Sequence, residues 1–186
     1  AVVTVVSIKA GEKLLKLAES GLIELKRRPY TGADLGGMFL VICATDDEEL
    51  NRQVGRDAGK INMLCNIADR PESCNFILPA LVKRGDLVIA VSTSGKSPAF
   101  AKKIRKDLEK QYGVEYADFL KLMGAIRKKL LSNSHEPEAH KPLFEKLINK
   151  DIIQLLRNND KDKIDSVLFE VLGEGYGYMD LMGQEE

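Results

Sequence analysis

Short runs of β-branched and other apolar residues alternate with amphipathic stretches over the first 112 residues, and this alternation limits the possible folds more than any other feature. The runs with a strand pattern cover residues 1–7, 22–27, 38–44, 62–67 and 86–92. Strands that alternate with helical patterns are typical of a parallel sheet whose strands are joined by crossover helices. The sequence therefore predicts the α/β fold class, with a parallel sheet over residues 1–112.

Three helices are predicted between or after these strands. The first ends at Gly21, which suits a helix C-cap. The second covers about 47–58, and Asp46 with Glu49 has the spacing of a capping box. The third begins at Pro98, because proline is favoured in the first turn of a helix. Their apolar faces are Leu14, Leu17 and Ala18 in the first helix and Ala101, Ile104 and Leu108 in the third.

After Gly113 the strand pattern stops and three helical stripes follow, with a predicted loop at residues 131–142 between two of them. The stripes are Tyr116, Phe119, Leu120, Met123, Ile126 and Leu130, then Phe144, Leu147, Ile148, Ile152 and Leu155, then Ile164, Val167, Leu168, Val171 and Leu172. Three short helices have little core of their own. We therefore expect residues 113–186 to pack on the domain at 1–112, on a second copy of the chain, or on both.

The charge balance limits the classes of partner. The chain has 28 basic and 28 acidic residues and a formal net charge of +0. Binding to nucleic acid or to a membrane surface usually needs a basic excess. No apolar run approaches the length of about 18 residues that a membrane span needs. The sequence therefore predicts neither a nucleic-acid partner nor a membrane partner.

The three cysteines are Cys43, Cys65 and Cys74, an odd number without metal-ligand spacing. Cys43 and Cys65 lie inside apolar strand-like runs. We interpret them as small buried apolar residues in a reducing compartment, which predicts a cytoplasmic protein.

The chain opens with Ala-Val-Val-Thr-Val-Val at residues 1–6, a run that predicts a buried strand from the first residue. A domain seldom begins inside a core strand. We therefore expect that an upstream segment has been lost, cleaved or left out.

The run 39–47 predicts a buried strand that ends in polar residues, Thr45 and Asp46, where a helix begins. Ligands of open α/β sheets bind at the carboxyl ends of the strands, where helix N-termini offer free N–H groups. The same two residues are also typical of a simple helix cap, so spacing alone leaves both interpretations open.

The run 62–71 has the same layout, with Asp69 on the segment that leaves a strand. A carboxylate there can act as a general base, and Arg70 beside it would favour the ionised form. Pro71 disfavours helical geometry at Arg70. A turn-forming aspartate explains the pattern equally well.

The run Ser-Thr-Ser-Gly-Lys-Ser-Pro at residues 92–98 is the strongest physical signal in the sequence. It brings hydroxyls, a glycine and Lys96 to the start of a helix, where the helix dipole favours an anion. A nucleotide-binding P-loop would need a glycine five residues before Gly95, and this position is Ala90. The row Lys102, Lys106 and Lys110 is either a solvated helix face or a further contact for a polycarboxylate.

His135 and His140 are five residues apart with Pro137 between them, so they do not have the spacing of a zinc protease motif. We interpret them as loop residues and predict no metal site.

Eight short motifs occur in one order along the chain. They are Val-Thr-Val-Val (3–6), Arg-Pro-Tyr (28–30), Ala-Thr-Asp-Asp (44–47), Asn-Arg (51–52), Cys-Asn-Ile-Ala-Asp-Arg-Pro (65–71), Asn-Phe-Ile-Leu-Pro (75–79), Arg-Gly-Asp-Leu (84–87) and Ala-Val-Ser-Thr-Ser-Gly-Lys-Ser-Pro (90–98). In this order the chain resembles precorrin-2 dehydrogenases, which include the N-terminal half of bacterial sirohaem synthase. The resemblance is clear to about residue 112 and looser beyond it.

The resemblance implies a Rossmann-like, NAD-binding domain at 1–112 and a helical region for dimerisation and substrate covering at 113–186. It implies oxidation of precorrin-2 to sirohydrochlorin with NAD as the cofactor, by a homodimer, on the way to sirohaem. Bifunctional members of the family also insert iron into sirohydrochlorin.

The resemblance also implies roles for individual residues. Ala44, Thr45 and Asp46 correspond to the nicotinamide side of the cofactor pocket, and Ser7 to the neighbourhood of the adenosine ribose. Asp69 corresponds to the aspartate with the main catalytic role, as the general base. The substrate-side loop comprises Thr93, Ser94, Gly95, Lys96 and Ser97. Some members carry a regulatory serine in this loop, where position 93 is threonine here.

Two departures from the family pattern stand out. The family begins with a strand and a glycine-rich turn that holds the NAD pyrophosphate, and Gly11 is too isolated to replace that turn. The second departure is Ser94, which occupies a position of the substrate-side loop where glycine is common in the family. Two competing hypotheses are therefore a non-catalytic, tetrapyrrole-binding dimer that has lost its cofactor loop, and an unrelated α/β module that binds anions.

Overall fold

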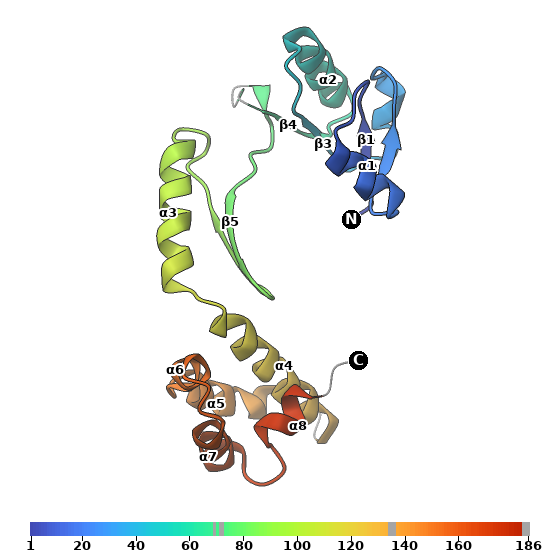
Figure 1. Ribbon diagram of the computed structural model, residues 1–186. Coiled ribbons are helices and arrows are strands. Elements are labelled where there is room, and N and C mark those ends of the chain that lie inside the picture. Colours follow the sequence, from blue (N-terminus) through green and yellow to red (C-terminus); the bar gives the residue numbers. More distant parts are fainter. Residues whose placement is uncertain (69, 71–72, 134–136, 184–186) are drawn as a thin grey trace. The chain divides into compact units, whose positions relative to one another are not determined.

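The computed structural model describes residues 1–68, 70, 73–133 and 137–183. The chain divides into two compact units, Ala1–Leu78 and Pro79–Glu186 (Figure 1). This division does not fall at residue 112, because the segment that follows Leu78 pairs with residues further along the chain. The functional domain boundary at 112 stays a prediction.

The first unit begins with a parallel pair of strands. Strand β1 (Thr4–Val6) pairs with β2 (Glu24–Lys26), with Thr4 opposite Glu24. Helix α1 (Glu12–Glu19) connects them, and Gly21 follows it with φ of 70°, as a residue beyond a helix C-cap requires. The strands are only half-buried, and Val2 is 95% exposed, so the prediction that the chain opens in a buried strand is wrong.

A second parallel pair holds the core of the first unit. Strand β3 (Leu40–Cys43) pairs with β4 (Leu64–Ile67), and helix α2 (Glu48–Lys60) connects them. The buried residues are Leu35, Cys43, Val54, Ala58, Met63, Cys65 and Ile67. Both buried cysteines are free thiols, as predicted.

A short 3₁₀ helix, η1 (Gly32–Leu35), lies beside α2. Asp34 accepts hydrogen bonds from the backbone N–H of Thr31 at 2.9 Å and from the guanidinium of Arg28 at 2.8 Å. The hydrogen bonds from Arg28 hold the pKa of the Asp34 carboxyl well below its usual range. The ion pair therefore fixes the path of the chain between β2 and β3.

The second unit begins with an antiparallel hairpin. Strand β5 (Ala80–Arg84) pairs with β6 (Leu87–Val91) through the two-residue turn Gly85–Asp86. The sequence predicted the strand at β6 but placed it in a parallel sheet, and β5 was missed. Residues 80–84 end in two cations, which obscured the strand, although a two-residue Gly-Asp connection is itself a hairpin signal.

Helix α3 (Pro98–Gln111) follows the hairpin and packs against it, with Val82 and Ala101 buried. Arg84 donates hydrogen bonds to the backbone oxygens of Tyr112 and Glu109, which joins the end of β5 to the end of α3. The hairpin and α3 thereby pack together as a two-stranded sheet covered by one helix.

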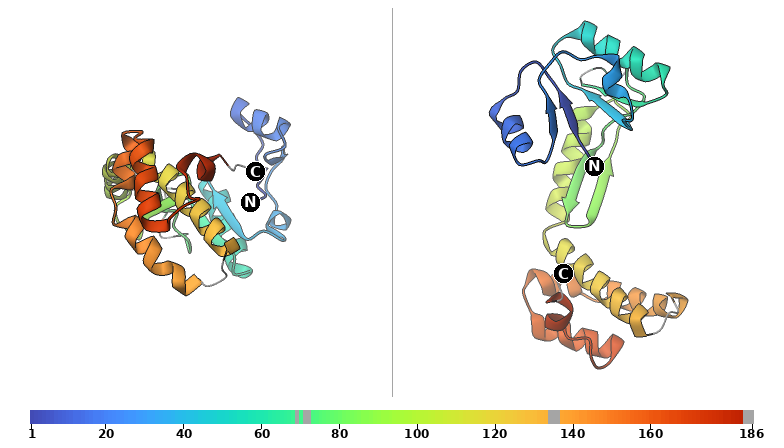
Figure 2. Two further views of the ribbon diagram at one scale, coloured as in Figure 1. Left: turned by 90° about the horizontal axis from the view of Figure 1, so that it is seen from below. Right: turned by 90° about the vertical axis from the view of Figure 1, so that its right-hand side faces the viewer.

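The remainder of the second unit is helical (Figure 2). Its helices are α4 (Glu115–Asn133), α5 (Pro137–Ile148), α6 (Ile152–Arg157), α7 (Lys161–Leu172) and α8 (Tyr178–Met182). The fully buried side chains include Leu122, Ile126, Leu147, Ile152, Ile164 and Leu168. The expectation that these helices have little core of their own is therefore wrong, because the 19-residue α4 supplies a long apolar face for α5, α6 and α8, and α7 packs on these three helices.

Two further sequence predictions need correction in the helical region. The predicted loop at 131–142 is helical at 131–133 and at 137–142, with Pro142 inside α5. The predicted stripe from Phe144 to Leu155 belongs to two helices, because the chain turns at Lys150 and restarts at Asp151, the N-cap of α6. Ile148, assigned to that apolar stripe, is 59% exposed. No helix in the described part of the chain is long and apolar enough to cross a membrane.

The α/β fold class is confirmed, with parallel pairing for the first four strands. Within the described residues, however, no backbone hydrogen bonds join the two parallel pairs into one sheet. The edges of β1 and β3 that do not face β2 and β4 are therefore free of strand partners among these residues.

Candidate functional site

The turn after β3 carries three of the residues that the sequence singled out. Ala44, Thr45 and Asp46 are exposed in the segment between β3 and α2. The N-cap of α2 is Asp47, whose carboxylate accepts hydrogen bonds from the backbone N–H groups of Glu49 and Leu50, both at 3.0 Å. The prediction that Asp46 caps this helix is therefore wrong by one residue, and Asp46 is left without a capping role.

The buried side chain of Asn51, on α2, fixes this turn. Its amide nitrogen donates to the backbone oxygen of Thr45 at 3.0 Å, and its amide oxygen lies 2.7 Å from the Thr45 hydroxyl. The thiol of Cys43 donates to the same amide oxygen at 3.0 Å. Asn51 thus ties the end of β3 and the start of the turn to the first turns of α2. No role was predicted for Asn51, although a polar residue on the apolar side of a helix is the signal that could have revealed it.

Ser7 follows β1 in the same unit. Its backbone N–H donates to Lys26 O at 3.1 Å, which extends the β1–β2 pairing by one residue, and its hydroxyl donates to Lys9 O at 2.7 Å. The hydroxyl is therefore engaged in the local turn. Its role beside an adenosine ribose stays a prediction.

Asp69, the predicted general base, lies outside the described residues. The strand before it, β4, is well defined. The side-chain amide of Asn75 accepts a hydrogen bond from Cys65 N at 2.6 Å and donates to Met63 O at 2.9 Å. Among the described residues this amide therefore takes the place of a neighbouring strand at the edge of β4 that does not face β3. Asn66, which lies on β4 itself, donates from its side-chain amide to the backbone oxygen of Phe76 at 2.9 Å. The resemblance included these asparagines without assigning them this structural role.

The five residues of the predicted anion loop lie in the second unit, between β6 and α3. The backbone N–H of Lys96 donates to Thr93 O at 3.0 Å, and the two residues between them, Ser94 and Gly95, have φ of 51° and 77°. Two successive positive φ values define a type I′ turn. Ser97 is the N-cap of α3 and accepts a hydrogen bond from Phe100 N at 3.3 Å, with Pro98 at the predicted position.

Thr93 closes this turn. Its hydroxyl accepts a hydrogen bond from Ser97 N at 3.1 Å, and Ser92 accepts one from Ser94 N, also at 3.1 Å. The side chains of Ser94 and Lys96 are exposed, and the first turn of α3 contains no acidic residue. The turn therefore presents a hydroxyl and a cation to solvent at a positive helix end, which suits an anion.

The two turns differ in charge. The turn before α2 carries the carboxylates of Asp46 and Asp47, and Glu48 and Glu49 follow in the first turn of the helix. Because Asp47 already occupies two N–H groups of α2, this helix end does not suit a phosphate. A neutral or cationic group fits it better, whereas the turn before α3 suits a carboxylate.

Nearby titratable groups are structural. Burial raises the pKa values of the Cys43 and Cys65 thiols, so both stay protonated and are poor nucleophiles. Burial and the Asp57 carboxylate raise the pKa of Tyr30 to about 12, and its hydroxyl donates to Asp57 at 3.3 Å. Over the residues that the structure describes, no cluster of three or more His, Cys, Asp or Glu side chains could hold a metal ion.

Comparisons with known proteins find matches for both segments that carry the two turns. Residues 1–80 match a family model described as "Putative NAD(P)-binding", and residues 84–111 match one described as "Sirohaem biosynthesis protein central". The fold is therefore Rossmann-like, and its first 80 residues are similar to the class of NAD(P)-binding domains.

Relatives and a solved structure narrow this class. The chain is 30% identical over 170 residues to a siroheme synthase of Methylococcus capsulatus and 30% identical over 158 residues to one of Escherichia coli. These alignments cover 91% and 84% of this chain but 36% and 35% of the relatives. The chain therefore spans about a third of their length.

The structure of SirC, a precorrin-2 dehydrogenase, superposes with a TM-score of 0.69 at 25% identity, covering 90% of this chain and 82% of that chain. The chain belongs to the family that includes this dehydrogenase and the corresponding part of the siroheme synthases.

Proposed function

We propose that the chain carries the NAD-dependent oxidation of precorrin-2 to sirohydrochlorin in sirohaem biosynthesis. The observation that supports this most directly is the opposite charge of the two strand-to-helix turns, one acidic and one basic. A dehydrogenase that uses oxidised NAD on a polycarboxylate must accept a cationic nicotinamide ring and an anionic substrate. The family relationship makes this pairing of ligands the most economical explanation of the two turns.

The residues of the first unit fit the nicotinamide part of the cofactor. Ala44 is small and exposed, so a flat ring can approach the backbone there, and the carboxylate of Asp46 complements the positive charge of the oxidised ring. When bound, NAD supplies a hydride acceptor. Asn51 holds the turn in place for this contact through Thr45. The pyrophosphate needs a different site, since the N-terminus of α2 is filled by Asp47.

The loop at Thr93–Ser97 binds carboxylates of the substrate in this proposal. Ser94 and Lys96 are exposed and free to bind a carboxylate, while Thr93 and Ser97 shape the turn. The exposed row Lys102, Lys106 and Lys110 continues this positive charge along α3. Precorrin-2 carries several carboxylate arms, so several weak contacts of this kind would add.

Asp69 is the general base of the proposed reaction. It would accept a proton from the substrate as the hydride leaves, and Arg70 beside it in sequence favours the ionised carboxylate. The same carboxylate could accept pyrrole protons during iron insertion, so ferrochelation of sirohydrochlorin is proposed as a second activity. A homodimer in the cytoplasm completes the proposal.

The first experiment is anaerobic incubation of the chain with precorrin-2 and NAD, followed by the absorbance of sirohydrochlorin. Asp69→Asn keeps the size of the side chain and removes the base, and we expect product formation to be lost in this variant. Lys96→Gln should raise KM for precorrin-2 while kcat stays nearly constant. Lys16→Gln, an exposed lysine of α1, is the matched control and should change neither quantity. NADP in place of NAD tests the choice of cofactor.

The second measurement separates the alternatives. The chain should be assayed alone and with a strand and glycine-rich turn from a siroheme synthase fused before Ala1. Product from the fused form alone would indicate that the pyrophosphate site must be supplied by that segment. If neither form gives product but both bind sirohydrochlorin, the chain is a non-catalytic tetrapyrrole-binding protein. If neither form binds a tetrapyrrole, the unrelated anion-binding module is the better hypothesis.

A further inference from the structure

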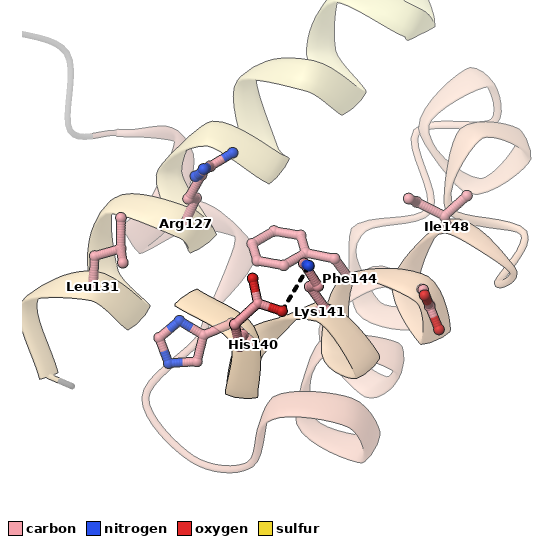
Figure 3. Close-up of a pocket in the computed structure, with 8 residues that line it drawn as sticks. Arg127, Leu131, His140, Lys141, Phe144 and Ile148 are labelled. Atoms are coloured by element: carbon pink, nitrogen blue, oxygen red, sulfur yellow. Dashed lines mark ion pairs between the residues drawn. The ribbon is translucent and has the colours of Figure 1, made fainter. Parts of the chain in front are cut away.

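The helical region contains a pocket of about 420 Å³ between α4 and α5, which we call the α4–α5 pocket (Figure 3). Arg127 and Leu131 project from α4, and His140, Phe144, Glu145 and Ile148 line it from α5. The residues proposed above for NAD and precorrin-2 are not among those that line it. Its volume is in the range of small-molecule sites.

His140 is the residue that points to a ligand. It is only 8% exposed, yet its imidazole makes no hydrogen bond or ion pair with any residue that the structure describes. No sealed nitrogen or oxygen within the described side chains lacks a partner, so the ring nitrogens of His140 are accessible rather than enclosed, and His140 is among the residues that line the pocket. A buried imidazole with open nitrogens can donate to or accept from a bound molecule.

The charged side chains that line the pocket determine which net charge a ligand must have to fit it. Lys141 is neutralised by Glu138, whose carboxylate lies 2.6 Å from the ammonium (Figure 3). Arg127 has no acidic partner among the described residues, so its guanidinium is available for a carboxylate. The carboxylate of Glu145, which also lines the pocket, would repel a second carboxylate of the ligand. A ligand with one negative charge therefore fits best.

The remaining wall is apolar. Leu131, Phe144 and Ile148 face the pocket, and Ile148 is 59% exposed despite its hydrophobic side chain. In Figure 3 the ring of Phe144 points from α5 toward Arg127 on α4. An aromatic or branched apolar group would bury this surface and could stack on the phenyl ring.

From these features we propose that the α4–α5 pocket binds a small monocarboxylate with an aromatic or branched apolar body. The carboxylate pairs with Arg127, His140 supplies a hydrogen bond, and the apolar body covers Phe144 and Leu131. This site is separate from the proposed oxidation. A polycarboxylate tetrapyrrole does not fit it, because such a ring is too large for the pocket and Glu145 would repel its further carboxylates.

The test is titration of the full chain with phenylacetate, followed by calorimetry and by the NMR shifts of the His140 ring protons. We expect saturable binding with shifts at His140. Benzylamine, which has the same ring and the opposite charge, should bind at least tenfold more weakly. NAD should not displace phenylacetate.

Arg127→Gln should weaken phenylacetate binding at least tenfold, and its exposed position makes a folding defect unexpected. The matched control is Lys128→Gln, an exposed cation next in sequence that does not line the pocket, and its affinity should equal that of the unmodified chain. Ile148→Trp should also abolish binding by filling the pocket from an exposed position. Equal affinity in the Arg127→Gln variant, equal affinity for benzylamine, or the absence of saturable binding would each overturn the proposal.

Discussion

The two strand-to-helix turns, one in each compact unit, are held by different means. The turn before α2 is fixed by side chains, with Asn51 bonded to Thr45 and Asp47 capping the helix. The turn before α3 combines a type I′ backbone turn at Ser94 and Gly95 with hydrogen bonds to three hydroxyls, those of Ser92, Thr93 and Ser97. The first arrangement leaves an acidic surface and the second a neutral to basic one. The same position between a strand and a helix can therefore suit ligands of opposite charge, depending on which residues bond to the free N–H groups at the helix N-terminus.

The largest expected effect is at Asn51. Asn51→Ala removes three hydrogen bonds at a buried position and should destabilise the first unit by about 2–3 kcal/mol. The turn should loosen as well, so NAD affinity should fall by more than the loss of stability explains. Urea unfolding and NAD titration measure the two effects. Arg52→Ala, at the neighbouring exposed position, is the control and should change stability by about 0.5 kcal/mol or less. A similar loss in both variants would contradict the role given to the Asn51 amide.

The next effect tests the backbone turn. Gly95→Ala places a side chain at φ of 77° and should destabilise the second unit by about 1–2 kcal/mol. Ser94→Gly relieves the same strain at φ of 51° and should stabilise the unit by about 0.5 kcal/mol. Thermal unfolding followed by circular dichroism measures both. Changes of the same sign in the two variants would show that left-handed geometry does not govern this turn.

The helix caps should differ in strength by a smaller amount. Asp47→Ala loses two hydrogen bonds and a favourable charge at the helix dipole, so about 1 kcal/mol is expected. Ser97→Ala loses one longer bond, and Pro98 keeps the helix start preorganised, so about 0.5 kcal/mol is expected. Hydrogen exchange of the first-turn amides reports on each helix separately. A larger loss at Ser97 than at Asp47 would reverse the comparison.

The smallest effect concerns one acid–arginine pair in each unit. Hydrogen bonds from Arg28 and Arg157 lower the pKa values of Asp34 and Glu115. Since these folded-state pKa values lie below the unfolded ones, each pair stabilises the protein above about pH 4 and loses its contribution as pH falls through the lower folded value. The effect should be modest because the arginine side chains are 42% and 49% exposed.

Asp34→Asn should therefore reduce the acid sensitivity of the first unit, and Glu115→Gln that of the second. Hydrogen exchange between pH 3 and 7 can follow the two units separately. If either substitution flattened the profile of the other unit, the pairs would not act locally.

The fold was partly predictable from local patterns. Five strands, the three helices of the first 112 residues, α4 and α7 follow from apolar periodicity and helix caps, because these signals act over a few residues. The antiparallel pairing of β6 was not predictable in this way, since it depends on β5, whose apolar run ends in Lys83 and Arg84. The break between α5 and α6 was also missed, because the apolar spacing continues through the turn at Lys150.

Local sequence patterns and the resemblance were enough to predict the class of the fold, the family, and the segments at 44–46 and 93–97 as candidate ligand turns. Tertiary structure decided which atoms hold those turns, because the bonds from Asn51 and Thr93 join residues four to six positions apart in geometries that no periodic pattern encodes. It also decided that the helices after Gly113 have a core of their own and that His140 is buried beside a pocket. Both depend on how the faces of separate helices meet, and this is a property of packing rather than of any single segment.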